Sequence, residues 1–333
     1  MTTKRVLQFS VGIIISIIFL FLALHKVNLG EVLTAIKNAR YIYVVYAVIL
    51  TVLSLINRTF RWRYLLNQPK PLRHYNLFAA TCIGLMSNNI LPFRLGDFVQ
   101  TYFLGRKEKI SKTFIFSTVM LERLFDLVTL LAFFGLASLL VTVSGQVKGI
   151  KYVVWAVFVA IAGVILFLEY GKRTEDFLKK AVGYFSPQLA AKVSGWIDSF
   201  ISGFQVIQHG KSLVKIILLS LFGWVINISV LWAVLTAFHI YQPFPAATFV
   251  ITIIMISVMI PSSPGFIGTW EYFGVLALGL FNVDKNQALS CILIHHMSQY
   301  FTISALGLFF LAKEGMSIKE VEHISETRDE SNG

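Results

Sequence analysis

The chain has 333 residues, of which 56% are hydrophobic and only 14% are charged. Because a soluble domain usually carries about a quarter of charged residues, the composition excludes a water-soluble globular protein, a disordered chain and a nucleic-acid-binding tail protein. The net charge of +12 is typical of the basic cytoplasmic loops of a membrane protein, or of attraction to anionic lipid headgroups. We expect an all-α polytopic membrane protein with no nucleic-acid partner.

The first two apolar runs predict membrane spans. Residues 6–24 follow two basic residues and lack a small-residue cleavage site, which favours a retained first span with a cytoplasmic N-terminus. Residues 41–56 form the second run. The arginines that follow it, Arg58, Arg61 and Arg63, are interpreted as a cytoplasmic orientation signal, and binding of lipid phosphate is the alternative.

The third run differs from a simple span. Residues 76–91 end in a turn that contains Pro92 and Gly96, and a short apolar piece, residues 98–104, precedes a basic segment. A single crossing here would place that basic segment outside, so charge asymmetry favours a re-entrant hairpin that enters and leaves on the cytoplasmic side. Non-helical backbone at this depth requires burial in protein or a wet cavity.

Two further runs complete the first part of the chain. Residues 113–143 are long enough to span with tilt, and residues 152–168 return to the cytoplasm. Between residues 174 and 206 the apolar side chains recur at helical spacing on one face. This pattern predicts a cytoplasmic amphipathic helix that lies on the inner leaflet, or one that packs against the protein itself.

The second part of the chain repeats the order of the first. Residues 213–240 predict a span, and residues 244–260 run into a second turn rich in proline and glycine. Residues 272–281 return from this turn, and residues 288–312 form the last span before a polar cytoplasmic tail, residues 314–333.

The two turns have matching residues. Pro92 and Pro264 lie 172 positions apart, as do Gly96 and Gly268, and inverted repeats with interrupted helices are typical of secondary transporters. We therefore expect about six spanning helices plus two re-entrant hairpins in an inverted repeat. The alternative is an eight-span bundle with proline kinks. The expected units are a single membrane domain, residues 1–313, with halves at about residues 6–143 and 152–312.

Charged residues inside the runs are the first candidates for function, because a charge at the membrane centre costs about 2.5–3.5 kcal/mol on insertion scales. Glu122 and Asp126 share a helix face, and Arg123 is placed to pair with Asp126. They indicate an internal ion pair or a headgroup or proton site. Arg94 and Asp97 fit a phosphate pocket, since arginine binds phosphate through two hydrogen bonds. Alternatively, Arg94 pairs with Glu122 or Asp126.

The second turn and the last span hold the other candidates. Ser262, Ser263 and Glu271 offer hydroxyls and a carboxylate to a polar headgroup, or serve only the turn. His295 and Gln299 lie one helical turn apart and are expected to line a cavity. Two adjacent histidines point about 100° apart on a helix, so we expect no metal site here, and the sequence gives no motif for a cofactor.

The candidates fall into three groups by expected role. Those assigned to lipid-headgroup binding are Asn88, Asn89, Arg94, Asp97, Arg123, Ser262, Ser263 and Glu271. Those assigned to charge balance or proton coupling are Glu122, Asp126, His295 and Gln299. Those assigned to the hairpin tips are Pro92, Gly96, Pro264, Gly265 and Gly268.

Three segments carry a family resemblance. NNILPFRLGD at residues 88–97, ERLFD at residues 122–126 and PGFIGTWE at residues 264–271 resemble the lysylphosphatidylglycerol synthase transmembrane-region family, which is flippase-like. Asp97 stands where the family often has Glu. The resemblance covers about residues 5–313 and implies a polytopic inner-membrane protein that handles anionic or polyprenyl-type lipids.

The resemblance also bears on catalysis. In the long members of the family, a separate soluble aminoacyltransferase domain transfers lysine to the lipid. Here about 20 polar residues follow the last apolar run, so we expect a stand-alone membrane domain without that activity.

We expect a flippase or transporter-like protein of the cell membrane, with both termini cytoplasmic, that moves or binds a phosphate-bearing lipid. A phosphatidylglycerol derivative or a polyprenyl phosphate is the expected lipid, and anionic membrane lipids are the expected partners. One alternative is the membrane subunit of a lipid-modifying enzyme such as a phosphatidylglycerol lysyltransferase, with catalysis supplied by a soluble transferase partner. The other is a non-transporting envelope scaffold.

Overall fold

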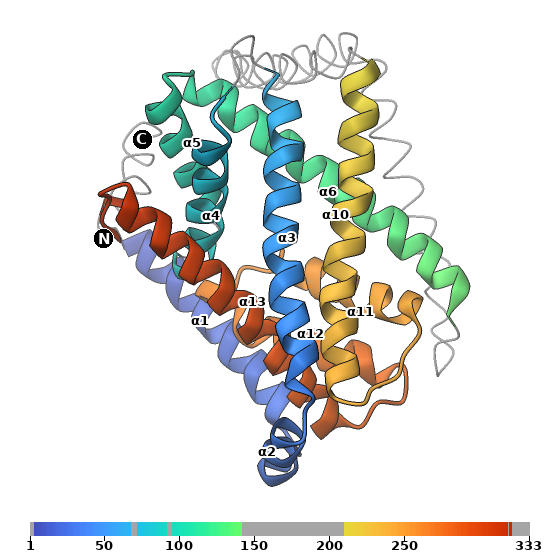
Figure 1. Cartoon of the computed structure of the whole chain (residues 1–333). Helices are drawn as coiled ribbons and strands as arrows, with labels where there is room; N and C mark the ends of the chain where they lie inside the picture. The colour runs from blue at the N-terminus through green and yellow to red at the C-terminus, as the bar shows by residue number, and fades with distance from the viewer. Residues whose placement is uncertain (1–2, 68–71, 92–94, 142–209, 319, 322–333) are drawn as a thin grey trace, which may run out of the picture.

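The computed structural model describes residues 3–67, 72–91, 95–141, 210–318 and 320–321, and every regular element within these ranges is a helix (Figure 1). This confirms the all-α membrane protein that composition predicts. Several sequence predictions lie outside the described residues. They are the turn residues Pro92 and Arg94, the span at residues 152–168, the amphipathic helix at residues 174–206 and most of the polar tail.

Three described helices are long and apolar enough to cross a membrane: α3 (Tyr41–Leu66), α6 (Lys112–Leu140) and α10, of which Ser212–Ala237 meets both criteria. A fourth span is reached if α1 (Thr3–Leu24) and α2 (Leu29–Lys37) are counted together, although they are bent by 82°. The long helix α13 (Lys285–Lys313) also carries histidines and other polar residues, which lower its hydropathy.

Helix α3 continues ten residues beyond the end of its apolar run, from Ile56 to Leu66. The run ends at Ile56, whereas the helix ends at Leu66 and is closed by Asn67 in the left-handed conformation, with φ of 36°. No proline or glycine interrupts the added turns. As a result Arg58 and Arg61, which the sequence analysis interpreted as an orientation signal, lie on a helix inside the molecule.

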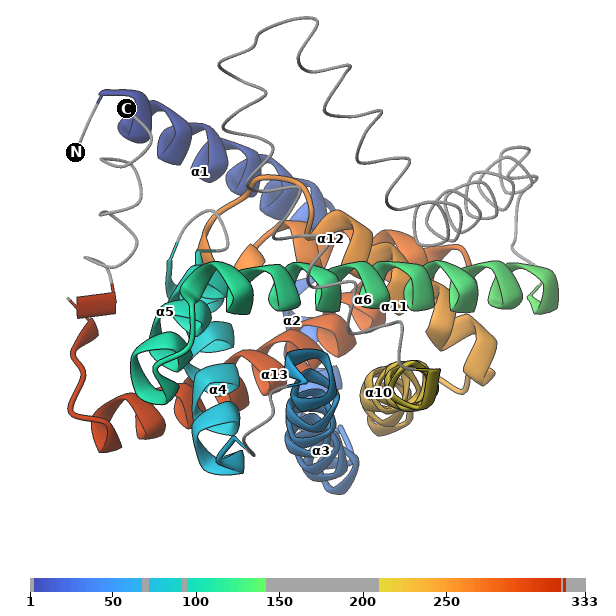
Figure 2. The ribbon, with the colours of Figure 1, turned by 90° about the horizontal axis from the view of Figure 1, so that it is seen from above.

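Helices α3 and α10 (Gly210–Ala237) stand side by side, as the end-on view also shows (Figure 2). Two contacts show that they run in opposite directions. Arg40 N donates to Ala237 O at 2.9 Å at one end of the pair. Asn57 Nδ2 donates to Leu219 O at 3.0 Å toward the other end. Helix α6 contacts both and crosses them obliquely (Figure 1).

The first broken segment is a helical hairpin of α4 (His74–Ile90) and α5 (Gly96–Glu108). The crossing is close, because a Cβ atom on Gly96 would lie 1.9 Å from Gly84 O. Only glycine fits this approach. Asn88 Oδ1 accepts a hydrogen bond from Gly96 N at 2.8 Å and so begins the second arm.

The second broken segment has the same plan, with α11 (Phe244–Ser257), the short 3-10 helix η3 (Pro264–Phe266) and α12 (Thr269–Gly279). Gly265 and Gly268 have φ of 71° and 91°, which favour glycine. The two hairpins occupy opposite halves of the molecule (Figure 1). Their tips meet, since α4 contacts η3 and a Cβ atom on Gly265 would lie 3.4 Å from Asn89 O.

The helix bounds follow the repeat that the two turns predict. From α3 to α10, α4 to α11, α5 to α12 and α6 to α13, each start recurs after 169 to 173 positions. Two apolar cores accompany the two hairpins. One is centred on α4, α5 and α3, and the other on α10, α11, α12 and α13. Large apolar side chains such as Phe21, Leu139 and Phe301 are exposed on the outside, as expected of a surface that faces lipid.

Candidate functional site

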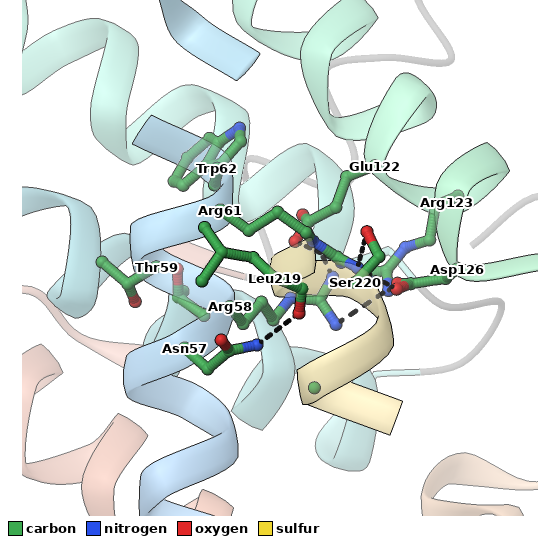
Figure 3. Close-up of polar contacts among 12 residues, drawn as sticks. Asn57, Arg58, Thr59, Arg61, Trp62, Glu122, Arg123, Asp126, Leu219 and Ser220 are labelled. Atoms are coloured by element: carbon green, nitrogen blue, oxygen red, sulfur yellow. Dashed lines mark hydrogen bonds and ion pairs between the residues drawn. The ribbon is translucent and has the colours of Figure 1, made fainter. Parts of the chain in front are cut away.

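Two arginines of α3 and two carboxylates of α6 form a buried ion network (Figure 3). Arg61 Nη2 lies 2.9 Å from Glu122 Oε1, and its Nη1 lies 2.6 Å from Asp126 Oδ1. Arg58 Nη2 lies 3.3 Å from Glu122 Oε2, and its Nη1 lies 4.0 Å from Asp126 Oδ2. Each arginine therefore contacts both carboxylates, because spacings of three and four residues place each pair on one helix face.

Helix α5 joins the network because its Asp97 contacts a third arginine, Arg123 of α6. Arg123 Nη2 lies 2.5 Å from Asp97 Oδ1, and its Nε donates to Asp97 Oδ2 at 3.3 Å. Arg123 Nη1 also lies 3.8 Å from Asp126 Oδ2, and this is the pair that the sequence predicts from a separation of three residues on one helix. From α10, Ser220 Oγ accepts a hydrogen bond from Arg61 Nη1 at 3.2 Å. The three arginines and three carboxylates have no net formal charge.

The network is more open on one side than on the other. The side chains of Glu122 and Arg61 are 0% and 4% exposed, whereas those of Arg123 and Asp126 are 24% and 22% exposed. The contact between Glu122 and Arg61 is therefore closed to solvent and structural. The outer residues are accessible to a ligand that competes for Arg123, and a phosphate oxygen suits a guanidinium in the same bidentate way as a carboxylate oxygen does.

Glu122 and Asp126 also have partners that the sequence analysis did not name. Arg94 lies outside the described residues, and besides the Arg123–Asp126 pair the described contacts come from Arg58 and Arg61. Sequence reasoning took these two arginines as an orientation signal. Their spacing of three residues directly after an apolar run is the signal that could have indicated a shared helix face. Arg63, in contrast, contacts His74 near the end of α3.

The asparagines of the first tip are used inside the fold. Asn88 caps Gly96, and Asn89 Nδ2 donates to Ser304 Oγ of α13 at 3.1 Å.

Sequence reasoning missed Gln100, which is 1% exposed and has no hydrogen-bond partner for either side-chain polar atom within the described part of the chain. It lies at the α4–α5 crossing, since a Cβ atom on Gly84 would lie 3.1 Å from its Oε1.

The second tip forms a separate cluster with α1 and α13. Ser263 N donates to Ser16 Oγ of α1 at 2.8 Å, and Thr269 Oγ1 donates to Ser262 Oγ at 3.4 Å. Glu271 Oε1 lies 2.5 Å from the Nδ1 atom of His296, the second of the two adjacent histidines, to which the sequence analysis assigned no role.

The last span places its two polar candidates together, one helical turn apart. His295 Nε2 lies 2.8 Å from Gln299 Nε2, so the pair that the sequence predicts on one helix face is in contact. His295 is fully buried, and its Nδ1 has no hydrogen-bond partner among the described residues.

Comparison with known proteins agrees with the motifs. Residues 9–307 match the family described as lysylphosphatidylglycerol synthase TM region. A UPF0104 membrane protein of Methanocaldococcus jannaschii is 23% identical over 91% of this chain and 94% of its own length. One from Methanothermobacter thermautotrophicus is 23% identical over 92% and 96%. Glycosyltransferase AglD of Haloferax volcanii is 25% identical over 98% of this chain and 58% of its own length.

Proposed function

The chain belongs to the lysylphosphatidylglycerol synthase transmembrane-region family, and from this premise we propose that it moves a phosphate-bearing lipid between the leaflets of the cell membrane. The observation that carries the proposal is the partly open side of the ion network, where Arg123 faces Asp97 and Asp126. The proposed orientation has both termini in the cytoplasm, so that the basic loops lie inside.

The proposed binding step is an exchange of partners at Arg123. A lipid phosphate takes the place of Asp97, whose two contacts with the guanidinium are those a phosphate can also make. Arg58 and Arg61 stay paired with Glu122 and Asp126 and keep the inner part of the network intact. In the sequence Arg94 precedes Asp97 by three positions, and we propose that it adds a second positive charge for the headgroup.

The proposed path runs between the two hairpin tips. Each hairpin is interrupted between its two helices and α4 contacts η3. Secondary transporters with broken helices hold their substrates at such interruptions. The headgroup moves along this polar path while the acyl or polyprenyl tails stay in the surrounding lipid. The exposed apolar side chains around the molecule support this division.

A second candidate is the membrane half of a lipid-modifying transferase. The likeness to glycosyltransferase AglD favours it, because this chain matches 58% of that protein and the rest of that protein extends beyond the match. In this case the network holds the lipid phosphate for a separate catalytic domain. Aminoacylated or glycosylated lipid made by the purified chain with a soluble partner, without leaflet exchange, would favour this candidate.

The test is leaflet exchange in vesicles that contain the purified chain. Fluorescent phosphatidylglycerol, lysylphosphatidylglycerol and a polyprenyl phosphate are compared, with dithionite to bleach the outer leaflet. We expect exchange of at least one lipid, and a loss of about tenfold or more in Arg123→Ala, because a hydrogen bond to a charged group contributes about 1.5–3 kcal/mol. Arg123→Lys keeps the charge but not the paired contact, so it is expected to be impaired as well.

The matched control is Arg106→Ala. Arg106 also pairs with a carboxylate, Glu320, but its side chain is 60% exposed. We expect normal exchange in this variant. Equal exchange in wild type and Arg123→Ala, with both proteins folded, would contradict the assignment of the site.

A further inference from the structure

The second hairpin holds a buried carboxylate–imidazole pair. Glu271, in the first turn of α12, and His296, on α13, are 2% and 4% exposed, and their Oε1 and Nδ1 atoms lie 2.5 Å apart. The other carboxylate oxygen of Glu271 accepts a hydrogen bond from Gly268 N at 2.6 Å. The ring of Trp270 stacks on that of His296, with centroids 4.7 Å apart and planes inclined by 9°.

The first half of the molecule has an acid–base pair at the corresponding position of its hairpin. Asp97 lies in the first turn of α5, and Arg123 lies on α6, the helix that follows the hairpin. Helices α12 and α13 both begin 173 positions after α5 and α6. His296 lies 173 positions after Arg123, and Glu271 lies 174 after Asp97. Each hairpin is thus joined to its following helix by a base and an acid.

The two pairs differ in their chemistry. An arginine stays charged at every pH that a protein experiences, so the Arg123–Asp97 contact does not respond to protons near neutrality. Histidine is the side chain whose ordinary titration falls between pH 5 and 8. The contact between Glu271 and His296 therefore has two states, a neutral ion pair with a proton bound and a pair with one negative charge without it.

We propose that Glu271 and His296 form a proton-binding site that couples lipid movement to the proton gradient. The inference rests on the function proposed above. A bound proton makes the pair neutral and gives the imidazole a positive charge, so that ion pairing adds to the hydrogen bond and holds the start of α12 more firmly to α13. Loss of the proton leaves a negative charge inside the protein and loosens this contact. The flanking Gly265 and Gly268, both with positive φ, are where the backbone turns.

Few other titratable groups surround the pair. Helix α12 contacts α1, α11 and α13. Helix α11 has no titratable side chain, and α1 has only Lys4 and Arg5 in its first turn. His295 precedes His296 on α13, and the Tyr300 ring lies 6.3 Å from that of His296.

Helix α13 also contacts α2, α3, α4 and α10. Helix α12 itself has one further titratable side chain, a tyrosine. Among the described residues, no ion pair or hydrogen bond links Glu271 or His296 to a titratable group of these helices. Those groups are Glu31, Lys37, Tyr41, Tyr43, Tyr46, Arg58, Arg61, Arg63, Tyr64, His74, Tyr75, Cys82, Lys215 and Tyr272.

The first test needs no transport. A charged imidazole stacked on an indole quenches its fluorescence, so Trp270 reports the charge of His296. The fluorescence of the purified full chain in lipid nanodiscs is titrated between pH 4 and 9. Trp270→Phe identifies the contribution of this tryptophan among the six. We expect a pH-dependent transition that disappears in His296→Gln and that also changes in Glu271→Gln, because Glu271 Oε1 is the atom that contacts the imidazole.

The control is His295→Gln, because His295 also lies beside Trp270, at 5.7 Å between ring centroids. We expect the transition to remain in this variant. A transition that survives His296→Gln, or that disappears with His295→Gln alone, would overturn the assignment of the proton site.

The second test applies a pH difference across vesicles that exchange lipid. Wild type is expected to change its rate of lipid exchange by about tenfold when the pH gradient is reversed. His296→Gln is expected to exchange lipid at the same rate under either direction of the gradient. A wild-type rate of lipid exchange that does not depend on the pH gradient would overturn the coupling and leave the proposed transport intact. Absence of exchange in every protein would overturn both transport and coupling, and the fluorescence titration would still decide whether the proton site exists.

Discussion

Glu122 is the position where one substitution tests the ion network most directly. Glu122→Gln keeps the size of the side chain but removes its charge, which leaves Arg58, Arg61 and Arg123 facing only two carboxylates. Glu122 is completely buried, and two arginines lie 2.9 and 3.3 Å from it. Breaking a buried pair on one side usually destabilises a protein by about 3–5 kcal/mol, because an uncompensated charge remains.

The assay is reversible unfolding in mixtures of mild detergent and SDS, followed by circular dichroism. Glu320→Gln is the matched control, since this carboxylate also contacts an arginine but is 38% exposed. An exposed pair contributes below about 1 kcal/mol, so the control is expected to unfold like wild type.

A double variant separates charge from packing. Arg61→Gln together with Glu122→Gln restores the balance of charges in the network. We expect the double variant to be more stable than the sum of the two single effects by about 0.5–3 kcal/mol, the range for residues in one network. Additive effects, or a Glu122→Gln protein as stable as wild type, would refute the conclusion that the buried charges are balanced within this network.

Two further predictions concern packing. Gly96→Ala is expected to prevent stable folding of the first hairpin, because the added Cβ would lie 1.9 Å from a backbone oxygen of α4, whereas Gly279→Ala, with nothing within 4 Å, is expected to be tolerated. Yield and thermal unfolding of the two proteins would compare them. Thr118→Val removes the acceptor for Trp62 Nε1, 3.1 Å away and buried, and is expected to cost about 1–3 kcal/mol. Thr118→Ser, which keeps the hydroxyl, is expected to lose less, and equal stability of the two would contradict the importance of this bond.

The sequence predicts the helices better than their contacts. Hydropathy places α4 and α5 correctly, because the break between them contains proline and glycine that a continuous helix would exclude. The matched turns at Pro92 and Pro264 likewise predict the recurrence of helix starts. These features are local, so they can be identified without knowledge of the fold.

The members of the ion network could not be predicted in the same way. Hydropathy treats Arg58 and Arg61 as the end of a span, and only the approach of α6 shows that they lie inside the protein. The choice between His295 and His296 depends on a rotation of about 100° around the helix axis. Helix α13 is buried on several sides, so the apolar pattern does not set this rotation.

The location of the network in the chain bears on how the protein is made. The six charged residues described in the network lie from Arg58 to Asp126, and Ser220 is its contact from the later half. Chains emerge from the ribosome N-terminus first, and their parts fold in that order. The first half can therefore satisfy its own intramembrane charges before α10 is synthesised, so that the nascent chain is not held in the membrane with unpaired arginines while it waits for its second half.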